Sequence, residues 1–393
     1  MTSNLSSLCT YAKGKVSVDT LPKQNYVSTE NMLPNKEGIV DAGGLPSVQY
    51  VQQYIKGDIL VSNIRPYFKK IWMADKDGGC SNDVLVFRAA HGCDSTFLYY
   101  VLSNDAFFNY ASATSKGTKM PRGDKTAIMQ YEVPCFDHET QLRIGKLLRS
   151  IDARITINKK INDNLEQQAL AIFRQYFMDF APYGGTVPSD WAEVSLDNVC
   201  IRITDGSHYS PTDSPDSPYS MYSVKDMETY GFNSSACKHI TEEEFRKMRK
   251  GDCVPLLNDI LVAKDGSYLK EIFICSEEKN EAILSSIAIF RPDTSIIMPE
   301  ILLYLLKQPS VRKDVGDNYV SGSALPRIVL KDFKKYRFML PPMGEQLRIG
   351  SALHAIRMQT KANIDEIRRL SSIRDTLLPK LMSGELDVSA VEL

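Results

Sequence analysis

Apolar positions recur every seven residues along two long segments of the chain. The repeated positions are Ile144, Ile151, Asn158, Leu165 and Ile172 in the first segment, and Ile349, Ile356, Asn363, Leu370 and Leu377 in the second. Midway between them lie Leu148, Ile155, Asn162 and Ala169 in the first segment, and Leu353, Thr360, Ile367 and Arg374 in the second. This four-three spacing is typical of a long helix that packs along another long helix. We therefore predict helices over about residues 139–177 and 345–378, with Pro379 ending the second helix.

The two helical segments belong to an internal repeat. Gln141–Gly145 occurs again as Gln346–Gly350, 205 residues later (346 − 141). The matching stretches elsewhere are Asp58–Val61 with Asp259–Val262, Phe87-Arg88 with Phe290-Arg291, and Gly117–Arg122 with Gly322–Arg327. The pentapeptide, the heptad positions and the Gly117–Arg122 stretch all repeat at this same 205-residue distance. A repeat at a fixed distance indicates that the protein contains two copies of one structural plan.

Each predicted helix follows a module of mixed secondary structure. In the first module, residues 58–61, 84–87 and 131–133 are strand-like, and residues 95–112 have the pattern of an amphipathic helix capped by Ser95 or Thr96. In the second module, residues 299–315 form the equivalent helix, with Pro299 at its first position.

The predicted fold class is α+β, with two pseudo-repeated mixed α/β modules separated by two long antiparallel coiled-coil helices. The predicted boundaries are module 1 at 1–137, helix 1 at 138–178, a linker at 179–190, module 2 at 191–343, helix 2 at 344–379 and a tail at 380–393. The opening edge of module 1 stays undefined, because no counterpart of Trp191–Val194 precedes its first strand. The short linker leaves helix 1 as the available partner for helix 2, so we expect the helices to run antiparallel with the modules at opposite ends.

Asn158 and Asn363 occupy equivalent positions in the middle of the two apolar repeats. A buried polar pair in a coiled coil fixes the register of the helices at some cost in stability. The alternative is that both asparagines are solvated on a loosely packed seam.

The amino-acid composition excludes few functions. The chain has 393 residues, 43% of them apolar and 24% charged, with a net charge of −1, which argues neither for nor against nucleic acid. No apolar run has the length of a membrane span, and the N-terminal residues lack the apolar core of a signal peptide. The eight cysteines include no Cys-x-x-Cys pair, so we expect reduced thiols in a cytoplasmic protein.

No motif for catalysis is present in the sequence. It lacks a Gly-x-Gly-x-x-Gly loop, a Walker A lysine loop and the Asp-Pro-Pro-Tyr type of tetrapeptide that amino-methyltransferases use. The five histidines are not at metal-ligand spacing. We therefore expect neither a catalytic residue nor a metal site.

Polar loops with basic and aromatic residues are the candidate binding sites. Lysine and arginine neutralise phosphates, while asparagine, serine and arginine hydrogen-bond to base edges. The candidates are Ser28, Asn31, Asn63, Arg65, Tyr67, Lys69, Lys116, Lys119, Arg122 and Lys125 in module 1, and Ser207, His208, Tyr209, Lys225, Lys264, Ser267, Tyr268, Lys270, Ser323 and Arg327 in module 2. Ordinary solvated loops are the alternative. In both modules, however, such a loop directly follows the matching Asp-Ile-Leu-Val strand. For Arg122 and Arg327 two uses stay open: binding, or fixing a turn against the base of the helix.

The chain resembles the specificity subunit of type I restriction-modification enzymes. The resemblance lies in Gln141–Gly145, Gln346–Gly350, the ending Leu377–Leu386, and the segments Tyr26–Met32 and Asp205–His208. It implies that each module is a target recognition domain that reads one half of a split sequence in double-stranded DNA. It also implies that the helices set the gap between the halves and dock two modification (methyltransferase) subunits.

The resemblance further implies restriction (translocase and nuclease) subunits as partners and no membrane. S-adenosylmethionine, ATP and Mg would then bind the partner subunits, leaving this chain without a cofactor. Two alternatives come from other classes of protein. An antiparallel coiled-coil scaffold that binds proteins through its end modules would retain no duplex DNA when a methyltransferase partner is added. A nuclease or fused methylase would cleave or methylate DNA unaided.

Overall fold

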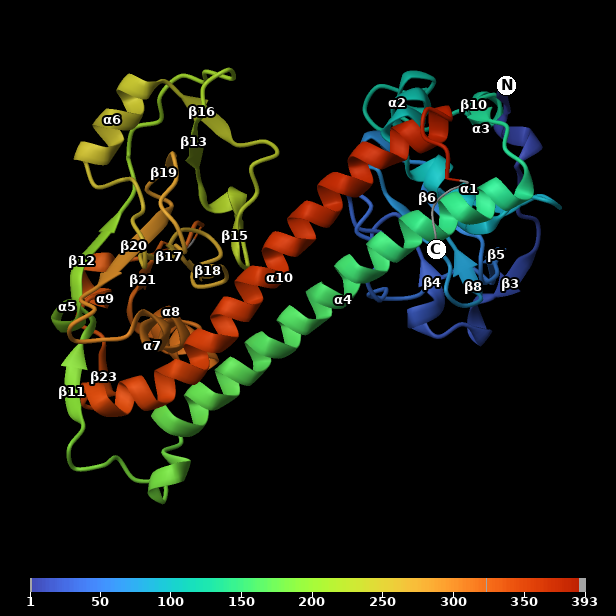
Figure 1. Ribbon diagram of the computed structural model, residues 1–393. Helices are drawn as coiled ribbons and strands as arrows, with labels where there is room; N and C mark the ends of the chain where they lie inside the picture. Colours follow the sequence, from blue (N-terminus) through green and yellow to red (C-terminus); the bar gives the residue numbers. More distant parts are fainter. Residues whose placement is uncertain (1, 323, 389–393) are drawn as a thin grey trace. The chain divides into compact units, whose positions relative to one another are not determined.

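The computed structural model describes residues 2–322 and 324–388, which form two compact units. Unit 1 comprises residues 1–157 and 366–393, and unit 2 comprises residues 158–365. Each unit combines one mixed α/β module with parts of the two long helices, α4 (His138–Phe177) and α10 (Met343–Ser383) (Figure 1). The predicted α+β class is confirmed.

Unit 1 contains two four-stranded sheets and one two-stranded sheet. The first sheet has the order β2-β9-β6-β7 and the second has the order β3-β5-β8-β4, while β1 pairs with β10. The strands are β1 (Thr2–Asn4), β2 (Cys9–Tyr11), β3 (Lys15–Ser17), β4 (Tyr26–Val27), β5 (Tyr50–Tyr54), β6 (Ile59–Ser62), β7 (Ile71–Met73), β8 (Gly78–Cys80), β9 (Val84–Ala89) and β10 (Glu132–Pro134). All neighbours are antiparallel except β4 and β8.

Unit 2 repeats this plan with additions. Its central sheet has the order β12-β20-β17-β18, which is equivalent to β2-β9-β6-β7, and its β11–β23 pair is equivalent to β1–β10. A second sheet has the order β16-β13-β19, and β14–β15 and β21–β22 are short pairs. The strands are β11 (Ala192–Ser195), β12 (Cys200–Asp205), β13 (Tyr219–Tyr222), β14 (Met227–Glu228), β15 (Gly231–Phe232), β16 (Lys238–Ile240), β17 (Ile260–Ala263), β18 (Ile272–Ile274), β19 (Glu281–Ile283), β20 (Ile287–Pro292), β21 (Val320–Ser321), β22 (Arg327–Ile328) and β23 (Arg337–Leu340).

In both modules the predicted single helix is two helices. Residues 95–112 fold as α1 (Ser95–Ser103) and α2 (Asp105–Ala113), because Asn104 is extended and its side chain caps Ala106 N. The N-cap of α1 is Asp94, which accepts from Phe97 N, so the prediction of Ser95 or Thr96 was wrong. The equivalent pair is α7 (Pro299–Leu306) and α8 (Pro309–Asn318), where Pro309 lacks the N–H that would continue α7. Pro299 does begin its helix, as predicted.

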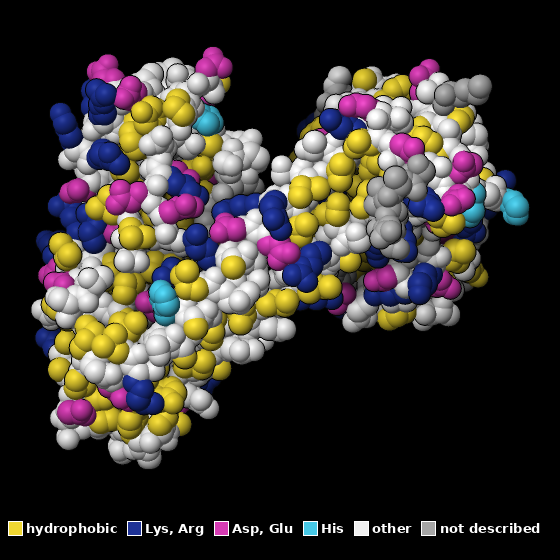
Figure 2. Space-filling model, viewed as in Figure 1, with side chains coloured by type: hydrophobic (Ala, Val, Ile, Leu, Met, Phe, Trp, Pro, Cys, Tyr) yellow, Lys and Arg dark blue, Asp and Glu magenta, His cyan; other side chains and the backbone are white. Residues whose placement is uncertain are grey.

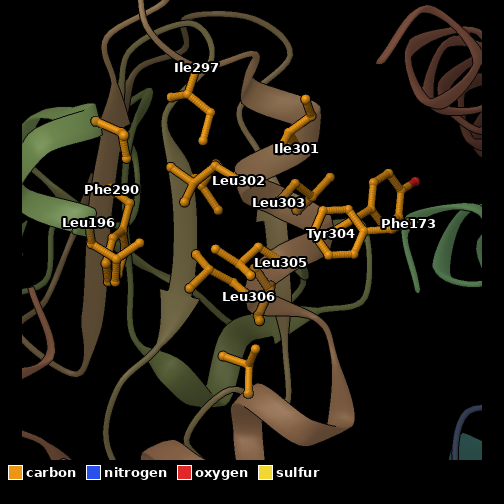
Figure 3. Packing of buried hydrophobic residues seen from close by; sticks show 14 of the residues in the cluster. Phe173, Leu196, Phe290, Ile297, Ile301, Leu302, Leu303, Tyr304, Leu305 and Leu306 are labelled. Atoms are coloured by element: carbon orange, nitrogen blue, oxygen red, sulfur yellow. The ribbon is translucent and has the colours of Figure 1, made fainter. Parts of the chain in front are cut away.

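Four further α-helices lie in the described parts of the modules. They are α3 (Lys125–Ile128) in unit 1, and α5 (Leu196–Val199), α6 (Glu242–Lys250) and α9 (Leu330–Phe333) in unit 2. The core of unit 2 lies between α7 and the central sheet, where Leu302 and Leu305 extend from α7 toward the side of Phe290 of β20 (Figure 3). Phe173 of α4 lies beside Tyr304 in the same view, so this helix contributes to the core of the module.

The prediction that Pro379 ends the second long helix was wrong. Pro379 lies inside α10, which continues to Ser383. Proline removes one hydrogen bond from a helix interior. The residues around it, Leu378 and Leu381, are 6% and 1% exposed in the core of unit 1, and this burial favours continuation of the helix past the proline.

The two long helices pack antiparallel within each unit. In unit 1, Asp152 accepts from Arg374 (2.9 Å) and Arg154 pairs with Glu366 (3.1 Å). In unit 2, Asn363 Nδ2 donates to Asn162 Oδ1 (2.8 Å). Asn158 and Asn363 are 1% and 6% exposed, so the interpretation of solvated asparagines is wrong. A role of Asn158 and Asn363 in fixing the register stays a prediction.

The repeated pentapeptide attaches each long helix to its module. Gln141 accepts from Asp94 N (3.0 Å) and donates to Phe136 O (3.0 Å). Gln346 accepts from Met298 N (3.0 Å) and donates to Ile296 O and Pro341 O (2.9 and 3.0 Å). Both glutamines therefore join the start of the long helix to the start of the module's helix pair.

Candidate nucleic-acid interface

Two hairpin loops of equal length occupy equivalent places in the two modules. Val61 of β6 pairs with Ile71 of β7, and Val262 of β17 pairs with Ile272 of β18. The residues between these pairs therefore correspond one to one, with Arg65 equivalent to Gly266 and Tyr67 equivalent to Tyr268. These are the loops that the sequence marked as candidate binding sites.

Each hairpin loop crosses the matching Pro-Arg segment. In unit 1, Arg65 N donates to Pro121 O (2.8 Å), and Ile64 forms a β-bridge with Arg122. In unit 2, Gly266 N donates to Pro326 O (2.7 Å), and Asp265 forms a β-bridge with Arg327. Loops that are far apart in the sequence are thus brought together in the same way in both modules.

A buried ion pair supports the first strand of each hairpin. Asp58 accepts from Nε and a terminal nitrogen of Arg88 (2.8 and 2.6 Å), and Asp259 accepts in the same way from Arg291 (2.8 Å for both). The carboxylates are almost fully buried. Hydrogen bonding to the carboxylate raises the pKa of each arginine. The repeated Asp and Arg residues of the sequence are therefore structural partners.

The loops of unit 1 carry several exposed candidates. Tyr67, Lys116, Lys119, Arg122 and Lys125 are exposed, and Arg65 and Lys69 are half-buried. Three of the cations are paired: Lys69 with Asp105 (2.9 Å), Lys116 with Asp124 (2.5 Å) and Arg122 with Asp83 (3.0 Å). Arg122 thus contacts a neighbouring loop, and the turn that contains it is held by mutual backbone hydrogen bonds with Lys116.

Two asparagine candidates of unit 1 lie below the surface. Asn31 donates to Tyr26 O and Val40 O (3.0 and 2.8 Å) and accepts from Ser28 N, so it and the half-buried Ser28 stabilise their loop. Asn63 is 7% exposed and its Oδ1 has no hydrogen-bond partner among the described residues. Sequence composition alone had given no means to tell these buried asparagines from exposed ones.

The candidates of unit 2 form two groups. Ser267, Tyr268 and Lys270 lie on the hairpin loop, Arg327 lies on the segment that this loop crosses, and Ser323 lies outside the described residues. Ser207, His208 and Tyr209 follow β12, where Ser207 forms a bridge with Leu284, and Lys225 lies in the turn after β13. His208, Tyr209, Lys225, Ser267, Lys270 and Arg327 are exposed.

Lys264 is not presented to solvent. Its side chain is 9% exposed and its ammonium is 2.6 Å from Asp205 Oδ2, which also lies 3.4 Å from His208 Nε2. Lys264 therefore stabilises the junction between β12 and the hairpin loop. The sequence did not indicate this ion pair, because Asp205 is 59 residues away from Lys264.

A cleft of about 280 Å³ in unit 1 was not apparent from the sequence. It is lined by Asn35, Lys36, Lys69, Asn104, Asp105, Arg374, Asp375, Leu378 and Pro379. Partial burial would raise the pKa of Asp105, but Lys36 (2.7 Å) and Lys69 together lower it below its ordinary value. The lining contains three cations (Lys36, Lys69 and Arg374) and two carboxylates (Asp105 and Asp375), a net charge of +1, so this cleft presents no strong charge.

Basic and acidic side chains are interspersed on both units in the face shown in Figure 2. On α6, for example, Glu242, Glu243 and Glu244 occupy the first turn and Lys247, Arg249 and Lys250 the last. Within residues 2–322 and 324–388, no group of His, Cys, Asp and Glu is arranged to hold a metal ion. None of the helices in this part of the chain is long and apolar enough to cross a membrane.

Comparison with known proteins defines the class. A family described as the type I restriction modification DNA specificity domain matches residues 1–167 and 188–369, which include both modules. The chain is 25% identical over 436 residues to the HindI specificity subunit of Haemophilus influenzae, covering 93% of this chain and 95% of that protein. It is 24% identical over 327 residues to the MjaIX specificity subunit of Methanocaldococcus jannaschii, covering 76% and 70%.

A solved structure has the same fold. The S subunit of the type I restriction-modification system from M. genitalium superposes with a TM-score of 0.60 at 16% identity, covering 97% of this chain and 96% of that one. The chain belongs to the type I restriction-modification DNA specificity family. It is a DNA specificity subunit, a non-catalytic component of the restriction-modification complex, as the resemblance in the sequence implied.

Proposed function

We propose that the two modules are target recognition domains and that each reads one half of a split sequence in double-stranded DNA. The observation that carries the proposal is the duplicated crossing of a hairpin loop over a Pro-Arg segment. In both units the crossing gathers exposed basic residues beside an exposed or half-buried tyrosine. A protein with two similar DNA-binding domains recognises two half-sites, and the geometry of the protein determines the separation between them.

The long helices supply the spacing in this proposal. Helices α4 and α10 are continuous over 40 and 41 residues, and each contributes to both units. An α-helix rises about 1.5 Å per residue, so a change in helix length translates directly into a change in the separation of the half-sites. The glutamine contacts of Gln141 and Gln346 hold each module firmly on its helix, which a spacer requires.

The helices also dock the partner subunits in this proposal. Leu142 and Leu347 are equivalent in the repeat and are 45% and 55% exposed at the start of α4 and α10. A repeated exposed leucine is suited to bind two copies of one partner, the modification subunits. We place S-adenosylmethionine, ATP and Mg on the modification and restriction subunits. The complex would act in the cytoplasm, where the eight free cysteines would stay reduced.

Methylation mapping tests this function. The full chain is produced with the modification subunits of its own system in a host that lacks adenine methylation, and methylated adenines are located across the genome. The expected result is one motif with two specified parts separated by a constant number of unspecified base pairs. An undivided motif, or methylation without sequence preference, would contradict the proposal.

A further inference from the structure

Arg65 has an unfavourable backbone conformation that its counterpart in unit 2 avoids. Its φ of +50° lies in the left-handed region, where the β-carbon of a non-glycine residue is crowded. The equivalent residue of unit 2 is Gly266, with φ +72°. The two residues are matched by the registers of their hairpins and by their hydrogen bonds to Pro121 O and Pro326 O.

A glycine satisfies this turn in unit 2, so the fold does not require an arginine in unit 1. Residues in strained backbone conformations cluster at functional sites. The functional reason is not an ion pair, because no carboxylate among the described residues lies within ion-pair distance of Arg65. Its Nε is buried without a hydrogen-bond partner in the described part of the chain, and one terminal nitrogen lies 3.5 Å from Lys119 O.

The difference between the repeats indicates what Arg65 binds. Contacts to phosphate carry no sequence information, so two modules that bind DNA are expected to share them. The Pro-Arg segment, with Arg122 and Arg327, is shared in this way. Arg65 and Gly266 differ at a position where the backbone is the same, as expected for residues that make the two modules read different bases.

We propose that Arg65 is a specificity-determining residue that hydrogen-bonds to a base edge in the first half-site. The guanidinium is suited to bind the O6 and N7 acceptors of guanine in the major groove. The crossing with Pro121 and Arg122 fixes the backbone from which it projects, and the burial of Nε limits the directions of its terminal nitrogens. This inference rests on the proposed function, in which unit 1 reads one half-site.

The test compares Arg65→Gly with the wild-type chain, each in complex with its modification subunits. Because glycine relieves the left-handed conformation, the melting temperature should be equal or higher. One base of the first half-site should become relaxed, with the preference for it reduced at least about fivefold in the methylation map. The second half-site and the gap should stay unchanged. Arg65→Lys keeps the charge without the planar fork and should relax the same base.

Asn258→Gly is the matched control. Asn258 also has a left-handed backbone (φ +68°), but it precedes β17 and lies outside the hairpin loop, so glycine there should keep the melting temperature equal or higher and leave both half-sites as they are. Retention of every base in Arg65→Gly would overturn the inference, and so would a change confined to the second half-site. If Arg65→Gly weakened methylation equally at all sequences, Arg65 would contact phosphate, and this result would also overturn the inference. An undivided motif in the wild type would instead refute the proposed function, so the two failures are distinguishable.

Discussion

The two buried ion pairs provide a matched test of how each module is stabilised. The carboxylates of Asp58 and Asp259 each accept three hydrogen bonds. Two come from the paired arginine, and the third comes from a backbone N–H, that of Ile55 for Asp58 and that of Leu256 for Asp259 (2.8 Å in both). The arginines differ in exposure, since the side chain of Arg88 is 37% exposed and that of Arg291 is 18% exposed. We predict that Asp259→Ala destabilises unit 2 more than Asp58→Ala destabilises unit 1.

The magnitude follows from the arginine that each substitution leaves without its partner. Removing one member of a buried ion pair costs about 3–5 kcal/mol, because the other charge stays desolvated. We expect a loss in this range for Asp259→Ala. Arg88 is twice as exposed and is rehydrated more readily, so we expect about 2–3 kcal/mol for Asp58→Ala, closer to the cost of an unsatisfied charged hydrogen bond.

Each unit contains one tryptophan, which makes the two losses separately measurable. Trp72 lies in unit 1 beside Tyr54, and Trp191 lies in the core of unit 2. Urea unfolding is followed by fluorescence in Trp191→Phe and Trp72→Phe backgrounds, so that each signal reports one unit. The exposed Asp19 and Asp216 are the controls, and their alanine variants should change little. A larger loss for Asp58→Ala, or a loss below about 1 kcal/mol for both variants, would refute the reasoning.

Two further predictions concern the start of the long helices. Gln141→Leu and Gln346→Leu should each destabilise their unit by about 1–3 kcal/mol by leaving buried backbone groups unpaired, with the larger loss for Gln346, which has three contacts. Alanine variants of the exposed Leu142 and Leu347 should have almost no effect in the same urea titration. Arg348 and then Tyr183 lower the pKa of Glu345 from 4.5 to about 2. This carboxylate therefore stabilises unit 2 above about pH 4.5 and loses that contribution as the pH falls toward 2; Glu345→Gln should flatten the acid limb of the Trp191 titration.

The repeat made most of the architecture predictable. Its heptads predicted α4 and α10, and its matched strands predicted equivalent modules, because periodicity reflects which face of an element is buried. The ends and interruptions of helices were less predictable. Asn104 interrupts one helix through a side-chain cap, and Pro379 fails to interrupt another because the leucines around it are buried in unit 1.

The sequence indicated which loops form the candidate site, but it did not indicate which of their side chains are exposed. The sequence indicated both hairpin loops and both Pro-Arg segments without indicating that they cross. Lys264 is neutralised by Asp205 and Asn363 pairs with Asn162, and both partners are distant in the sequence. The residues next to Arg65 do not predict its left-handed backbone conformation. The conformation becomes informative only when Arg65 is compared with Gly266, the glycine at the equivalent position of unit 2.

In the proposed function, the paired helices hold two DNA-reading modules a fixed distance apart. The most direct measurement inserts seven residues, one heptad, into α4 after Ile157 and into α10 after Asp365, which are the boundaries between the units. The insertions keep the heptad phase and lengthen both helices by about 10 Å, or about three base-pair steps. A seven-residue insertion in the linker at Gly184 is the control and should not change the gap.

The methylation map of the double insertion should show both half-sites unchanged and the gap between them longer by about three base pairs. An unchanged gap, or altered half-site bases at the original gap, would contradict the account.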